Sequence, residues 1–210
     1  SFDLNDDEAK KSYNKMFFAY LNTFKRLGLT AIPMEADTGP IGGDLSHEFV
    51  ILAETGESKI YSDKRIFDID ISSYNDSDDS IKNLRKKYDE YYAVTDEKFK
   101  KDDFENKIKK ENQLITKGIE VGHIFYFGDK YSKPLKCSVD LKDGKKVNVK
   151  MGSYGVGVSR LVGAIIEAKF NNNIMRWPES VSPFEVVIIP SLQKNDKSNG
   201  TYAIVETSGS

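Results

Sequence analysis

The chain has 210 residues, 31 of them basic and 33 acidic, giving a formal net charge of −2, and 39% are apolar. The apolar content is enough for one globular core. No apolar run reaches the roughly 18–20 residues that a membrane span needs, and the small net charge argues against nucleic-acid binding through bulk charge alone. Its single cysteine, Cys137, and two histidines, His47 and His123, exclude disulfide scaffolds and multi-histidine metal centres. No signal peptide is visible, so we expect a cytoplasmic protein without a membrane partner.

The first half of the chain predicts one helix and two strands. Residues 6–27 carry apolar side chains at spacings of three and four, with Asn5 before them as a cap and Gly28 after them as a stop. Residues 30–34 read as a short strand. Residues 48–53 are mostly apolar and read as a buried strand. The helix stripe is aromatic and predicts core packing.

Residues 57–117 differ in composition from the rest. They hold nearly half of the charged residues of the chain, with loose helical periodicity over 81–92 and 96–112. A segment of this kind is typical of a solvated insertion on a core fold. We therefore expect it to lie on the surface and to lack an independent core.

The core pattern resumes after this segment. Residues 119–127 predict a strand, and Asp143-Gly144 predicts a hairpin between strands at 137–141 and 145–151. A glycine-rich stretch then leads into a helix at 158–170. Strands joined by hairpins with few helices between them favour an antiparallel sheet and an α+β fold.

The two ends suggest a piece of a longer protein. The chain begins Ser1-Phe2-Asp3, without methionine, and the strand-like run 186–189 has no evident partner. Frayed ends of a small domain are the alternative. We expect a domain boundary near Ser182-Pro183.

Two clusters carry candidate chemistry. Gly155, Gly157 and Arg160 are not a dinucleotide fingerprint, because the last position is arginine rather than glycine. Glycines on a strand followed by an arginine in the first helical turn suit a triphosphate, and close helix packing is the alternative explanation. Glu120 and His123, three apart on a strand, share a face only if the chain bends at Gly122; a structural histidine is the alternative.

Several stretches, in order, resemble bacterial prolyl-tRNA synthetase, a class II aminoacyl-tRNA synthetase. They are ADTGPIGGDLSHEF at 36–49, KGIEVGHIF at 117–125, GDKYS at 128–132, MGSYGVGVSRL at 151–161 and WPESVSPF at 177–184. The resemblance covers roughly residues 1–57 and 117–190. It implies a class II antiparallel sheet flanked by helices, present here as a partial catalytic core.

The resemblance also implies roles for individual residues. Arg160, in the place of motif 3, would lie against the ATP phosphates as the catalytic charge clamp, with Gly155 and Gly157 as the adenine-side platform. A second group would line or border the proline and adenylate pocket: His123, Glu120, Ser153, Glu48 and His47. Ser153 stands where many family members have cysteine.

The implied reaction is ATP-dependent ligation of proline to tRNA(Pro) through prolyl-adenylate, with Mg²⁺, in a homodimer when full length. The implied organisation is core at 1–57, a charged insertion at 58–116 in place of the editing domain, core with motif 3 at 117–182, and the start of an anticodon-binding domain at 183–210. The fragment alone is expected to be inactive, and the shortened insertion is expected to lack editing. The alternative function is a synthetase-like module that binds nucleotide or tRNA without ligation.

Overall fold

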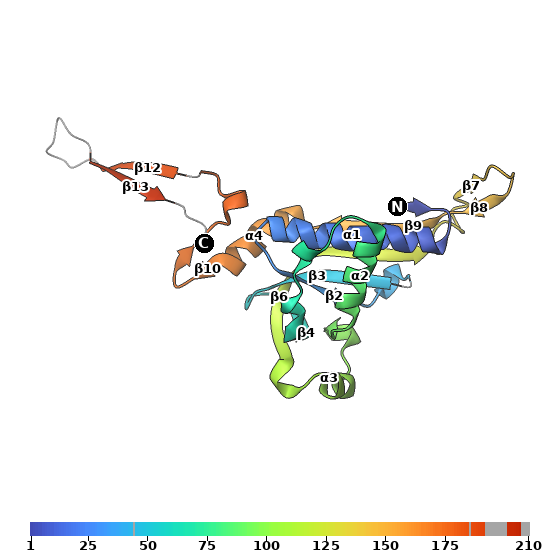
Figure 1. Cartoon of the computed structure of the whole chain (residues 1–210), viewed down its shortest axis with the longest axis horizontal. Helices are drawn as coiled ribbons and strands as arrows, with labels where there is room; N and C mark the ends of the chain where they lie inside the picture. The colour runs from blue at the N-terminus through green and yellow to red at the C-terminus, as the bar shows by residue number, and fades with distance from the viewer. Residues whose placement is uncertain (44, 185, 192–200, 207–210) are drawn as a thin grey trace.

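The computed structural model of the chain describes residues 1–43, 45–184, 186–191 and 201–206 (Figure 1). Its main unit is a seven-stranded sheet in the order β1-β9-β6-β3-β2-β5-β4. The strands of this sheet are β1 (Phe2–Asp3), β2 (Ala31–Glu35), β3 (Leu45–Leu52), β4 (Ser58–Asp63), β5 (Ala93–Thr95), β6 (Gln113–Gly128) and β9 (Lys150–Val156). The helices are α1 (Asp6–Arg26), α2 (Asp78–Asp89), α3 (Lys101–Lys107) and α4 (Val158–Lys169).

The sheet is antiparallel except where β2 and β5 pair in parallel through Glu35 and Val94. The first half of β6 also pairs with β4, while its second half pairs with β3 and β9, so the sheet folds back on itself. The α+β prediction with a mainly antiparallel sheet is confirmed. Within the described residues, no helix combines the length and apolar character that crossing a membrane would require.

Helix α1 forms as predicted and supplies the centre of the core. The Asn5 side chain accepts a hydrogen bond from the backbone of Glu8, which satisfies one of the free amide groups at the helix start. The helix lies across the sheet (Figure 1) and packs three aromatic rings, those of Phe17, Tyr20 and Phe24, around Phe49 of β3. All four are buried, and burial of rings of this size dominates core energetics.

The charged segment is more closely integrated than its composition predicts. Strands β4 and β5 belong to the main sheet, and α2 buries Ile81, Leu84 and Tyr88. A smaller cluster of buried side chains forms between β4, β5 and α3, namely Tyr61, Val94, Phe104 and Ile108. The expected solvated insertion describes only the charged face of the segment, because its few apolar residues are spaced to bury the other face. The helix predicted at 96–112 is limited to α3 and two short 3-10 turns.

Among the described residues, three two-stranded hairpins lie outside the main sheet. They are β7 (Ser138–Asp140) with β8 (Lys146–Asn148), β10 (Phe170–Asn171) with β11 (Ile174–Met175), and β12 (Val186–Ser191) with β13 (Thr201–Glu206). The first confirms the turn predicted at Asp143-Gly144, where Gly144 has φ +81°. The third corrects the expectation that the run at 186–189 has no partner. The rest of the predicted anticodon-binding start, residues 192–200 and 207–210, lies outside the described residues.

Candidate active site

The site is built on neighbouring strands β3 and β6, whose register places Glu48 opposite His123 and Ser46 opposite Phe125. Because side chains alternate along a strand, Ser46, Glu48, His123 and Phe125 all point to one face of the sheet. The predicted strand at 48–53 begins earlier, at Leu45. This longer strand brings Ser46 into the site, a residue that the sequence reasoning did not select, although its position two residues before Glu48 could have indicated it.

A β-bulge brings Glu120 onto the same face as His123. The pairing of β3 with β6 runs from Phe49 opposite Gly122 to Val50 opposite Glu120, so Val121 is an extra residue on β6. The sequence made a shared face conditional on a bend at Gly122, and the bulge at the neighbouring Val121 meets that condition. Gly122 itself faces α1, where a Cβ atom would lie 3.0 Å from the Tyr20 ring, so a larger residue would strain the packing behind the site.

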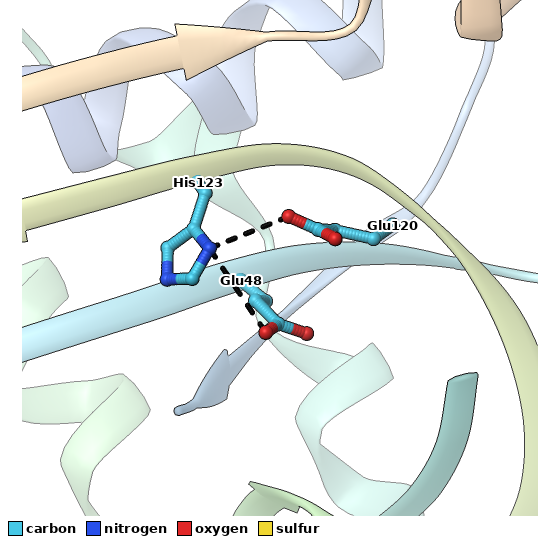
Figure 2. Close-up of side chains that lie close together, drawn as sticks. All are labelled: Glu48, Glu120 and His123. Atoms are coloured by element: carbon cyan, nitrogen blue, oxygen red, sulfur yellow. Dashed lines mark ion pairs between the residues drawn. The ribbon is translucent and has the colours of Figure 1, made fainter. Parts of the chain in front are cut away.

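The imidazole of His123 lies between two carboxylates, and Figure 2 shows Glu48 and Glu120 approaching the same ring nitrogen. The Nδ1 atom is 3.3 Å from Oε1 of Glu120 and 3.9 Å from Oε1 of Glu48. Its Nε2 atom is 2.5 Å from Oγ of Ser46, and the ring stacks on Phe125 at 3.8 Å between centroids. In the tautomer with its proton on Nδ1, beside the carboxylates, Nε2 is the acceptor for the Ser46 hydroxyl.

Burial and the nearby Glu120 carboxylate raise the pKa of Glu48 to about 7, against the opposing influence of His123. A carboxyl group in this range exchanges its proton near neutral pH, which is common where burial and like charges meet at a functional site. The group of Glu48, Glu120 and His123 also places three ligand atoms within 4.8 Å of one another. Mg²⁺ prefers oxygen ligands, so the two carboxylates suit this ion and the imidazole does not.

Arg160 lies in the first turn of α4 and reaches the same cluster. Its Nη1 donates to the backbone carbonyl of Glu120 at 3.0 Å and lies 3.8 Å from that residue's Oε2. It also pairs with Glu57 at 3.5 Å, and its side chain is half exposed. The structure thus connects Arg160, through Glu120, to His123.

Glu57 carried no sequence signal of its own. It enters the site because the turn before β4 packs tightly against β6: a Cβ atom on Gly56 would lie 2.2 Å from the Gly118 carbonyl oxygen. Only a residue without a side chain allows this approach. The turn therefore brings a second carboxylate, after that of Glu120, within reach of Arg160.

Strand β9 forms an open floor beside His123. Gly155 pairs with His123 and Ser153 with Phe125, and both are exposed on the site face. A Cβ atom on Gly155 would have only the His123 carbonyl oxygen near it, at 4.0 Å, so this glycine leaves a free backbone surface. Gly157, just before α4, has less free space than Gly155, because a Cβ atom there would lie 3.2 Å from Cβ of Arg160.

His47 lies on the opposite face of the sheet, so the prediction that it borders the same pocket as His123 is wrong. Adjacent strand residues face opposite sides, and His47 points under α1 towards Tyr13 and Arg85. Arg85 donates to Nε2 at 3.0 Å; a guanidinium has only donors, so Nδ1 carries the ring proton and donates to the Tyr13 oxygen at 2.5 Å. Burial and the Arg85 charge hold the pKa of His47 well below its usual range.

An antiparallel sheet with an arginine-headed helix after a glycine strand is the arrangement of a class II synthetase core. The sequence profile of the tRNA synthetase class II core domain (G, H, P, S and T) matches residues 2–169, and the chain belongs to this family.

Its relatives include proline–tRNA ligases from several bacteria. The chain is 66% identical over 200 residues to that of Pelagibacter ubique, covering 94% of this chain and 45% of that protein. It is 49% identical over 214 residues to that of Hyphomonas neptunium, covering 100% of this chain and 48% of that protein. It is 54% identical over 192 residues to that of Rhizobium etli, covering 90% and 43%. The chain is a homologue of these ligases and spans about half the length of the curated relatives it matches.

Proposed function

We propose that the protein to which this chain belongs ligates proline to tRNA(Pro) in two steps, with ATP as the activating substrate. The observation that carries the proposal is the connection of Arg160, Glu120 and His123 at one end of an open glycine floor, in a chain homologous to proline–tRNA ligases. The cytoplasm is the proposed compartment, and a homodimer the proposed assembly of the full-length protein.

In the first step the proline carboxylate attacks the α-phosphorus of ATP, and pyrophosphate leaves. Arg160 stabilises the charge that develops on the phosphates, where a guanidinium offers paired donors. Gly155 and Gly157 would face the adenine. His123, Glu120, Glu48 and Ser153 would line the place where the imino acid is held, so the protein would act by orientation and charge stabilisation.

In the second step the terminal ribose hydroxyl of the tRNA attacks the carbonyl carbon of the adenylate, and AMP leaves. Mg²⁺ bound with ATP would neutralise phosphate charge. The carboxylates of Glu48 and Glu120 could hold this ion, once the triphosphate displaces the ion pairs that Arg160 makes with Glu57 and Glu120. No side-chain nucleophile takes part.

Residues 58–116 occupy the place of the family's editing insertion, and we propose that they do not form an editing site. Their side chains instead complete the main sheet and its core. The remaining proposed divisions, core at 1–57 and 117–182 and a further domain from 183, follow the order of the motifs.

The decisive experiment is proline-dependent exchange of labelled pyrophosphate into ATP by the full-length protein. We expect exchange with proline and none above background without it, because only an enzyme that forms the adenylate reverses the step. Binding of ATP or tRNA without exchange would instead indicate the non-ligating module, and exchange driven by another amino acid would overturn the substrate assignment.

Gly155→Ala tests the proposed adenine platform. We expect the KM for ATP to rise about tenfold or more, because the new methyl group would stand on the surface where the adenine ring lies. The melting temperature should not change, since the nearest described neighbour, the His123 carbonyl oxygen, is 4.0 Å away. Gly163→Ala is the matched control: a Cβ atom there has no described atom within 4 Å, but it lies on α4 and should leave the KM unaltered. An unchanged KM in Gly155→Ala would contradict the platform.

A further inference from the structure

A row of aromatic rings extends from His123 along the site face of β6. Phe125 stacks on His123, Phe127 lies 5.6 Å from Phe125 at 21° between planes, and Tyr131 contacts Phe127 edge-on at 5.0 Å. We call Phe125, Phe127 and Tyr131 the aromatic row. All three rings keep part of their surface open.

The far end of the aromatic row leads directly into a basic segment, residues 129–150. This segment holds seven lysines against three aspartates in a chain whose net charge is −2, so positive charge is concentrated here. Its β7–β8 hairpin projects from the end of the sheet near the N-terminus (Figure 1). The start of the basic segment is held against the main body of the protein, because Lys130 and Tyr131 both donate hydrogen bonds to the backbone carbonyl of Ile41.

Three lysine side chains of the basic segment, those of Lys136, Lys142 and Lys146, are exposed and take no part in ion pairs among the described residues. Lys133, Lys145 and Lys150, by contrast, pair with aspartates. Unpaired lysines on a projecting hairpin form a positive surface that attracts a polyanion.

We propose that the aromatic row and the basic segment form the path by which tRNA reaches the site, and this rests on the proposed function. Bases of a single strand stack on aromatic faces while lysines follow the phosphates. The single-stranded 3′ end would lie on Phe127 and Tyr131, with its terminal ribose directed to His123, and the adjoining phosphates would lie on the β7–β8 hairpin.

The first test measures the salt dependence of tRNA(Pro) binding to the full-length protein. Replacing Lys136, Lys142 and Lys146 by Gln should reduce the slope of log K against log salt by about 2, since each phosphate contact contributes about 0.7–0.9. The matched control replaces Lys82, Lys86 and Lys110, also exposed, by Gln and should leave the slope unaltered. Equal slopes in the two triple variants would overturn the proposal.

The second test separates stacking from charge. Phe127→Leu should weaken binding of intact tRNA(Pro) about tenfold, the effect of one lost base stack, and should not weaken binding of tRNA trimmed of its single-stranded 3′ end. An equal loss for both RNAs, or no loss for either, would overturn the role of the row. Pyrophosphate exchange needs no tRNA, so its absence from the wild-type protein would count against the proposed function, whereas exchange with an unaltered salt slope would count against this path alone.

Discussion

Arg160→Ala should lower proline-dependent pyrophosphate exchange by the full-length protein by at least about 100-fold, equivalent to roughly 2.7 kcal/mol of transition-state stabilisation. The guanidinium is half exposed at the head of α4 and already contacts Glu120 beside His123, so it is free to meet incoming phosphates. The helix should keep its place, because Leu161, Ala164 and Ile165 anchor it in the core.

Two variants make this result specific. Arg160→Lys keeps the charge but loses the planar pair of donors, so it should recover only part of the lost rate. Arg176→Ala removes an exposed arginine outside the site and should change exchange less than twofold. Near-normal exchange in Arg160→Ala, with a normal melting temperature, would remove Arg160 from the proposed mechanism.

Phe49→Ala should destabilise the protein by about 3–5 kcal/mol, the largest stability effect that we expect from a single substitution. The ring is fully buried and lies 5.1–5.8 Å from the rings of Phe17, Tyr20 and Phe24. It also pairs with Gly122 where the bulge begins, so a cavity there loosens the support behind His123. The free energy of unfolding, measured by chemical denaturation, and the rate of pyrophosphate exchange should both fall.

Phe170→Ala is the matched control, because this ring is 54% exposed on the β10–β11 hairpin. It should cost less than about 1 kcal/mol. Phe49→Leu, which keeps most of the volume, should fall between the two. If Phe49→Ala unfolded at the wild-type denaturant concentration, the aromatic cluster would not be the centre of the core.

Much of the fold was predictable because its signals are local. The aromatic period of α1, the glycine stop after it and the Asp143-Gly144 turn each specify one element without tertiary information. The burial of part of residues 58–116 could not be predicted, because strands β4 and β5 are short and contain few apolar residues. Only pairing with β6 and β2 makes them part of the sheet.

The site was predictable to the extent that family motifs mark it. Glu120, His123, Arg160 and Gly155 meet at one place, and the bulge at Val121 explains how residues three apart share a face. The alternation rule could have separated His47 from Glu48, since neighbours on a strand point apart. Arg85 and Glu57 depend on long-range packing that no local pattern encodes.

The hydrogen bond from Arg85 to His47 joins α2 to the strand whose next residue, Glu48, faces the candidate site. This strand therefore has the charged segment on one side and the candidate site on the other. Any exchange of residues 58–116 for the corresponding part of a relative would leave His47 Nε2 without its donor, at a cost of about 1–3 kcal/mol, unless the graft restores a cation there. Residues 58–116 and strand β3 should therefore change together in evolution, because the hydrogen bond between Arg85 and His47 links them.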